Sequence, residues 1–224
     1  MKAIAHIRTD FHEKFGIPRQ SGLVESLEGR IIFEPEFRHP DAVRGLDQFS
    51  HIWLLWQFSE NEKKGWSVTV RPPRLGGNTR MGVFATRSPF RPNGIGMSCV
   101  RLKSVKFDDK LGPVLTVCGV DMMDKTPVLD IKPYIPLTDC HPEASEGYTK
   151  ETRKHALQVE FPEELLAQYP EEKRKAAVAV LSQDPRPGYS SDPERIYGVA
   201  FAGYDIKFRV KDDVLTVCGL EKVL

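Results

Sequence analysis

Short runs of β-branched and aromatic residues, bounded by glycine, proline and aspartate, dominate the first 140 residues of this chain. Six of these runs predict strands, at residues 2–8, 30–33, 49–58, 81–85, 97–107 and 113–121. In the fifth run the alternation of apolar and basic residues slips by one at Ser104, which indicates a β-bulge, and DDKLG (108–112) favours a hairpin turn. Because helical patterns are few here, the sequence predicts an antiparallel barrel or sandwich rather than a parallel sheet with crossover helices.

The pattern changes after about residue 140. A polar, linker-like stretch spans 138–155, and prolines followed by paired glutamates then predict helices at about 162–169 and 171–182. Three further apolar runs predict strands, at residues 195–201, 204–210 and 214–219. A small α+β domain over 155–224 is therefore expected to follow a mostly β domain over 1–145.

Charge is unevenly distributed in this sequence. No Asp or Glu lies between Glu62 and Asp108, and residues 63–107 carry a net charge of +10 although the whole chain carries +1. A segregated basic surface is typical of a protein with an anionic partner, and nucleic acid is the commonest such partner. The alternative is that acids from elsewhere in the fold pair with these basic residues.

Several other classes of protein are not supported. No apolar run approaches the ~20 residues that a membrane helix needs, and no signal-like segment opens the chain, so a cytoplasmic location and no membrane association are expected. The four cysteines have no metal-binding spacing, so we expect no metal site; Cys99, Cys118 and Cys218 lie in strand-like runs and are interpreted as buried thiols. No GxGxxG or Walker motif occurs, so any nucleotide-like cofactor must be held by another geometry.

Four turn-rich segments carry the polar residues from which a site can be built, at 16–26, 71–96, 121–136 and 183–189. In the second, prolines and glycines mount arginines on stiff turns, and the planar guanidinium suits phosphate and carboxylate. In the third, prolines break the backbone and free N–H and C=O groups for a ligand. In the fourth, Asp184, Arg186 and Tyr189 offer an acid, a guanidinium and a ring that can read a base. The alternative for this last segment is an Asp184 that pairs with its own Arg186.

Five phrases in these segments resemble the TrmO family, also called TsaA-like proteins. They are PRQSGL (18–23), DAVRGLDQFSHIWLL (41–55), RPPRLGGNTRMGVFATRSPFRPNGIGMS (71–98), DMMDKTPVLDIKPYIP (121–136) and QDPRPGY (183–189). The resemblance implies methylation of N6 of N6-threonylcarbamoyladenosine in tRNA, beside the anticodon, with S-adenosylmethionine as the methyl donor. It also implies a single-sheeted β-barrel as the N-terminal, cofactor-binding domain, and a homodimer with the cofactor near the subunit interface.

The resemblance carries roles over to individual residues. Cofactor-binding candidates are Gln20, Ser21, Gly22, Ser59, Glu60, Arg87, Met123, Thr126, Pro127, Val128 and Leu129. Ser59 and Glu60 stand where relatives often carry His and Gln, so this sequence departs from the family there. The chemistry of guanidinium and ring side chains, rather than the resemblance, makes five further residues substrate-binding candidates: Arg71, Arg74, Arg91, Arg186 and Tyr189.

Methylation of a urea-like N6 requires removal of its proton, and a carboxylate is the simplest proton acceptor. Asp130 and Asp184 are the first candidates for this role, with Asp121 behind them. Two other functions stay open at this point. One is a non-catalytic RNA-binding module whose basic face clamps tRNA, and the other is a methyltransferase that acts on a small molecule or a protein.

Overall fold

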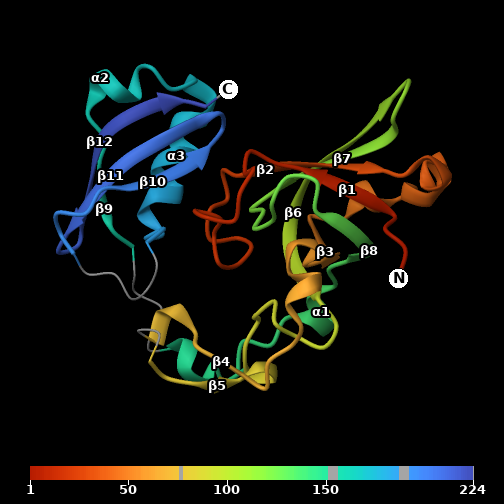
Figure 1. Cartoon of the computed structure of the whole chain (residues 1–224). Coiled ribbons are helices and arrows are strands. Elements are labelled where there is room, and N and C mark those ends of the chain that lie inside the picture. The colour runs from red at the N-terminus through yellow and green to blue at the C-terminus, as the bar shows by residue number, and fades with distance from the viewer. Residues whose placement is uncertain (76–77, 151–155, 187–191, 224) are drawn as a thin grey trace.

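A closed antiparallel barrel of six strands forms the first part of the chain (Figure 1). The computed structural model describes residues 1–75, 78–150, 156–186 and 192–223. The barrel strands are β1 (Ala5–Arg8), β2 (Glu28–Phe33), β3 (His51–Gln57), β6 (Ile95–Asp108), β7 (Gly112–Cys118) and β8 (Pro127–Pro133), in the order β1-β2-β7-β6-β3-β8. The predicted antiparallel barrel is therefore confirmed.

Alternation along the strands explains the barrel's interior. In β3, Ile52, Leu54 and Trp56 are buried, and the residues between them are partly exposed on the outer surface. Full burial of one such side chain stabilises the fold by about 2 kcal/mol. The bulge expected near Ser104 is present, because the register between β6 and β7 shifts between Leu102 and Ser104.

Two expectations about the strands are wrong. The sequence placed no strand in 121–136, yet β8 closes the barrel there by pairing with both β1 and β3. Its two prolines, Pro127 and Pro133, occupy the first and last positions, where a strand tolerates the missing N–H. In the run 81–85, only Met81–Gly82 is a strand (β5); it pairs with β4 (Thr69–Val70) outside the barrel, and Val83–Ala85 is a 3-10 helix.

A four-stranded sheet with helices forms the end of the chain. Its elements are β9 (Gln158–Glu160), α2 (Glu163–Leu166), α3 (Glu171–Ser182), β10 (Tyr197–Phe201), β11 (Tyr204–Lys211) and β12 (Val214–Lys222), and a short helix α1 (Pro136–Asp139) follows the barrel. The strand order is β10-β11-β12-β9, with β9 parallel to β12. α3 begins after Pro170 and buries one side, made of Ala176, Ala177, Val180 and Leu181.

The loop after β1 joins the sheet to the barrel. The Lys173 ammonium on α3 lies 2.5 Å from the Asp10 carboxylate, and the Ala202 N–H donates to the Asp10 carbonyl. The rings of Phe11 and Phe201 pack with centroids 5.0 Å apart. The two parts thus share one apolar core, and the division at 1–145 and 155–224 stays a prediction.

One of the expected buried thiols is exposed. Cys118 is buried and Cys99 is partly buried, but Cys218 is exposed. In β12, Leu215 and Val217 are buried, so strand alternation turns Cys218 outward. Among the described residues, no helix is long and apolar enough to cross a membrane, and no three His, Cys, Asp or Glu side chains form a group that could hold a metal.

Candidate functional site

Asp121, just after β7, lies at the centre of a buried hydrogen-bond chain. The Ser98 hydroxyl on β6 donates to Asp121 Oδ1 at 2.6 Å, and the Trp56 indole N–H donates to Ser98 Oγ at 2.9 Å. Ser98 is only 1% exposed. Gly96 makes room for this chain, because a Cβ there would lie 2.3 Å from the Trp56 ring. The barrel wall therefore holds the Asp121 carboxylate in one orientation.

The pKa of Asp121 is shifted upward. Burial raises it to about 6, although the Ser98 hydroxyl, the backbone N–H groups of Asp121 and Ser21, and the charge of Arg87 act in the opposite direction. The carboxylate is ionised at neutral pH but is more basic than an ordinary aspartate. Such shifted groups cluster at functional sites.

Two glycine backbones bring the first turn-rich loop to this carboxylate. The Gly22 N–H donates to the Gly119 carbonyl at 2.9 Å, and the Gly119 N–H donates to the Leu27 carbonyl at 2.8 Å. Both glycines have positive φ, 80° and 78°. A Cβ on Gly119 would lie 3.2 Å from Gly22, whereas a Cβ on Gly22 would meet nothing within 4 Å. Ser21 is thereby held against Asp121, with open space beside Gly22.

Arg87 joins this loop from the segment 71–96. Its guanidinium donates to the side-chain carbonyl of Gln20, and the Gln20 amide donates to the Arg19 carbonyl. Arg87 is exposed, so its remaining donors face solvent. A guanidinium fits the carboxylate of an S-adenosylmethionine molecule, and the open side of Gly22 leaves room for it.

The segment after Asp121 is pinned to the loop that follows β1. The buried Asp124 carboxylate accepts the Thr9 N–H at 3.1 Å and lies 2.9 Å from the Arg8 guanidinium. The Thr126 hydroxyl donates to the Met123 carbonyl at 2.8 Å. Met123 lies two residues after Asp121, in a turn that this hydrogen bond closes, and its cofactor role stays a prediction.

The next residues begin β8. The carbonyls of Thr126 and Val128 accept N–H groups of Ile7 and Ile4, so they are occupied by β1. Pro127 is partly buried, and Leu129 lies at the register irregularity between β8 and β3, outside regular pairing. Leu129 is thus freer than Val128 to contact a ligand. The cofactor roles of Thr126, Pro127, Val128 and Leu129 stay predictions.

Ser59 and Glu60 open a 3-10 helix (Ser59–Lys64) after β3, and both are exposed. A hydrogen bond of 2.5 Å from Lys14 to Asn61 ties this helix to the loop after β1. The described contacts do not bring Ser59 or Glu60 to Asp121, so their cofactor role stays a prediction.

Asp130 lies on the outer surface of the barrel, where β8 pairs it with Leu55. Its carboxylate is 2.8 Å from the Lys132 ammonium and accepts the Ile131 N–H at 2.9 Å. The described contacts do not bring it to the loop of Gln20 and Arg87.

Asp184 forms a two-pronged ion pair with Arg186, with N–O distances of 2.8 and 2.9 Å. This is the pairing that the alternative interpretation expected. Burial raises the pKa of Asp184, but the hydrogen bonds and charge of Arg186, aided by Arg19, outweigh burial and hold this pKa below its usual value. Arg19, whose charge contributes to this shift, belongs to the first turn-rich loop. Tyr189 lies outside the described residues.

The arginines of the segment 71–96 take different positions. Arg71 is exposed, and Arg74 belongs to a 3-10 turn (Pro73–Leu75). The Arg91 guanidinium donates to the carbonyls of Val83 and Thr86 at 3.2 and 2.6 Å, so it braces this segment.

Sequence reasoning missed Ser98 and Trp56 as parts of the site. A signal was present, because Ser98 is a hydroxyl at a buried position of β6, in phase with the buried Gly96 and Val100, and a buried hydroxyl requires a partner. The acid that follows the neighbouring strand is that partner.

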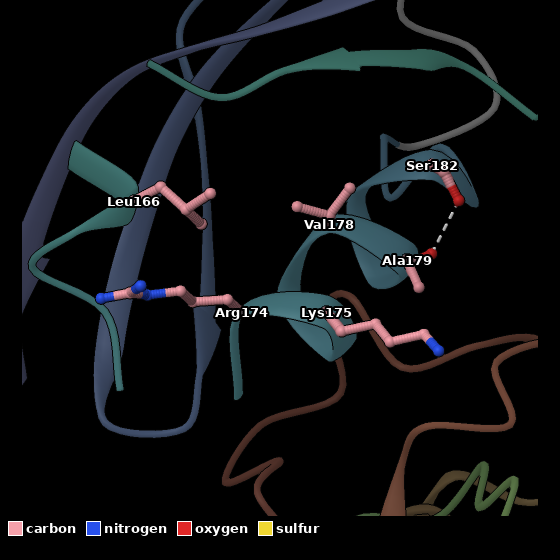
Figure 2. Close-up of a pocket in the computed structure, with 6 residues that line it drawn as sticks. All are labelled: Leu166, Arg174, Lys175, Val178, Ala179 and Ser182. Carbon is pink, nitrogen blue, oxygen red and sulfur yellow. Dashed lines mark hydrogen bonds between the residues drawn. The ribbon is translucent and has the colours of Figure 1, made fainter. Parts of the chain in front are cut away.

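A pocket on the other part of the molecule lies apart from these residues. It is lined by Leu166, Arg174, Lys175, Val178, Ala179 and Ser182, on α2 and α3 (Figure 2). The Arg174 guanidinium donates to the carbonyls of Tyr169 and Ala167, and the Ser182 hydroxyl donates to the Ala179 carbonyl. Most of its polar groups already have partners, so the pocket offers no chemistry comparable to that around Asp121.

Comparisons with known proteins agree with the sequence resemblance. A family model described as the tRNA-methyltransferase O N-terminal domain matches residues 6–140, and the TrmO C-terminal domain model matches 154–223. The tRNA (adenine(37)-N6)-methyltransferase of Escherichia coli (strain K12) is 44% identical over 226 residues, covering 97% of this chain and 96% of the relative. A putative S-adenosylmethionine-dependent methyltransferase RcsF of Pseudomonas aeruginosa is 41% identical over 211 residues, covering 91% of this chain and 89% of the relative. A crystal structure of TrmO from Pseudomonas aeruginosa matches with a TM-score of 0.77 and 33% identity, over 98% of this chain and 97% of that one. The chain belongs to the TrmO family.

Proposed function

We propose that this chain is an S-adenosylmethionine-dependent tRNA methyltransferase. It methylates N6 of the adenosine-derived nucleoside at position 37, beside the anticodon, and its target there is N6-threonylcarbamoyladenosine. The names of the relatives from E. coli and P. aeruginosa support the reaction and the methyl donor. The observation that carries the proposal is the placement of a basic, oriented carboxylate, Asp121, against the loop of Gln20–Gly22 and Arg87.

Asp121 is the proton acceptor in this proposal. S-adenosylmethionine supplies an electrophilic sulfonium methyl group. The N6 nitrogen shares its lone pair with the carbamoyl group, so it becomes a good nucleophile only when its proton leaves. Asp121 would accept that proton. N6 would then bond to the methyl group while the electrons of the broken sulfur–methyl bond stay on the cofactor sulfur, which leaves as a neutral thioether. The hydrogen bond from Ser98 orients the carboxylate. Holding the reacting groups in line lowers the activation barrier of methyl transfer by on the order of several kcal/mol.

Arg87 and the first turn-rich loop bind the cofactor. Arg87 holds its carboxylate, and Gln20 orients the guanidinium. Met123 and Leu129 line the adenosine side. Arg186 and Tyr189 contact the tRNA from the C-terminal part.

We further propose that the enzyme works in the cytoplasm as a homodimer. Exposed apolar side chains support a dimer: Met97 on β6, and Ile135 and Leu137 at the short helix α1 after the barrel, the last of them 91% exposed. Two separate family matches support a division into a cofactor-binding domain over 1–145 and a second domain over 155–224.

The proposal is tested by calorimetric titration with S-adenosylmethionine together with transfer of a labelled methyl group to total tRNA. We expect saturable cofactor binding and label in tRNA. Tight RNA binding without cofactor affinity would instead favour the non-catalytic RNA-binding module. Cofactor binding with label only in protein or small molecules would favour the third candidate function.

Three matched substitutions then locate the proton acceptor: Asp121→Asn, Asp130→Asn and Asp184→Asn. We expect Asp121→Asn to lower turnover by about 100-fold or more while cofactor affinity changes only a few-fold. The other two variants should retain most of their turnover. A larger loss in either of them would assign the role to that carboxylate, and loss of cofactor affinity in Asp121→Asn would make Asp121 a cofactor ligand.

A further inference from the structure

A small arm projects from the barrel between β3 and β6 and carries exposed aromatic rings. Figure 1 shows β4 and β5 away from the barrel strands. Of the arm's side chains, Trp66 is 54% exposed and Phe84 is 73% exposed, and Phe90 is also exposed. Val83 by contrast is buried, so the arm has a small apolar centre of its own. Large rings left in water on an ordered arm indicate a surface that a partner covers.

The arm is ordered by its own hydrogen bonds. The Ser67 N–H donates to the Phe90 carbonyl at 3.1 Å, and the Val83 N–H donates to the Val68 carbonyl at 3.0 Å. The Arg91 guanidinium binds the Val83 carbonyl and lies 5.8 Å from the centre of the Phe84 ring. The exposed rings are therefore presented on a braced scaffold.

Charge identifies the chemistry of the partner. Arg71, Arg80 and Arg87 of the arm are exposed. Among the described side chains of residues 63–107, Lys103 alone lies within 4 Å of a carboxylate, that of Glu28 on the barrel. The acids expected under the alternative interpretation thus do not neutralise the arm. Aromatic rings and arginines are enriched in protein interfaces too. Residues 63–107, however, contain no Asp or Glu and carry a net charge of +10. Rings among arginines without acids suit RNA, whose bases stack and whose phosphates pair with guanidinium groups.

We propose that the arm, residues 66–75 and 78–91, is a stacking platform for unpaired RNA bases, with Trp66 and Phe84 as the stacking rings and Arg71 and Arg80 as phosphate contacts. The bases of a duplex are already stacked, so only loop nucleotides can use such rings. The inference rests on the proposed function in one respect: the loop in question is the one that contains the methylated nucleoside.

The test measures the affinity of the full chain for two RNAs, an anticodon stem-loop and a fully paired duplex of equal length. The variants are Trp66→Ala and Phe84→Ala. The matched control is Phe107→Ala, a phenylalanine 62% exposed at the end of β6. We expect each arm variant to weaken stem-loop binding by about 5- to 150-fold, with duplex binding and cofactor affinity unchanged. Phe107→Ala should alter none of these.

A second pair of variants tests the phosphate contacts. Arg80→Gln should lower the slope of log affinity against log salt concentration by about one, and Lys106→Gln, on β6, should not. The proposal is overturned if the arm variants bind the stem-loop as tightly as Phe107→Ala does. It is also overturned if they change the oligomeric state in sedimentation experiments, because the arm would then be a protein interface.

Failure of this inference can be distinguished from failure of the proposed function. If the wild-type chain methylates tRNA and the arm variants bind normally, only the platform is wrong. If the wild-type chain transfers no methyl group but the arm variants lose stem-loop binding, the result supports the stacking platform and contradicts the proposed enzymatic function.

Discussion

At the scale of single residues, the buried Asp121 carboxylate lowers the stability of the folded protein at neutral pH. Such a destabilising charged group is typical of a functional site. Burial raises the pKa of Asp121 from the ordinary aspartate value of 3.8 to about 6. Between these values the folded state binds the proton more tightly than the unfolded state, so stability falls as pH rises through this range. Above pH 6 the cost is about 3 kcal/mol for this site.

We therefore expect the difference in unfolding free energy between Asp121→Asn and wild type to favour the variant more at pH 7 than at pH 4. Urea unfolding at both pH values measures the difference. Asp108→Asn is a control of opposite sign, because backbone N–H groups of Leu111 and Lys110 lower the pKa of Asp108. Stability from Asp108 is present at neutral pH and is lost as pH falls. An Asp121→Asn effect that is equal at both pH values would contradict the account.

Gly96 is expected to be intolerant of any side chain. Gly96→Ala would place a Cβ 2.3 Å from the Trp56 ring, so the ring must move and its hydrogen bond to Ser98 weakens. We expect a loss of unfolding free energy of about 1–3 kcal/mol by urea denaturation. Gly82→Ala, where a Cβ meets nothing within 4 Å, is the matched control. Equal losses in both variants would argue against this packing.

At the scale of elements, the contact between Gly22 and Gly119 holds the first turn-rich loop at the end of β7. Gly119→Ala strains a backbone with φ of 78° and also presses a Cβ against Gly22. Gly203→Ala, at φ 83° in the β10–β11 turn, has the same strain but no neighbour within 4 Å. Both variants should lose about 1 kcal/mol of stability, but only Gly119→Ala should weaken S-adenosylmethionine binding in calorimetry. Equal cofactor affinity in the two variants would show that the first turn-rich loop does not contribute to cofactor binding.

Elements whose pattern is local could be predicted from the sequence. The alternation in 97–107 indicated β6 and its bulge at Ser104, and the proline–glutamate pairs indicated α2 and α3. β8 could not be found this way, because its prolines read as breaks unless the pairing with β1 and β3 is known.

The same limit applies to the site. The loop of Gln20–Gly22 and Arg87 could be expected from the family phrases, and the structure joins them by a hydrogen bond. The sequence ranked Asp121 behind Asp130 and Asp184. Burial and the partnership with Ser98 depend on residues 23 positions apart, which no local pattern reports.

At the scale of the whole molecule, Asp10 and Lys173 connect the barrel to the C-terminal sheet. Lys173→Met should lower the unfolding free energy by about 1 kcal/mol, because this pair is partly exposed, and should leave cofactor affinity unchanged. Lys175→Met, on the same helix but exposed, is the control and should have little effect in urea unfolding. Equal effects would show that the pair does not join the two parts.

The central claim is that this barrel methylates one modified nucleoside in tRNA. The most direct test is mass spectrometry of nucleosides from tRNA incubated with the protein and methyl-labelled S-adenosylmethionine, using tRNA with and without the threonylcarbamoyl modification. The account predicts label on N6-threonylcarbamoyladenosine alone, and none in the unmodified tRNA. Label on another nucleoside, or no label in either tRNA when cofactor and RNA are intact, would contradict it.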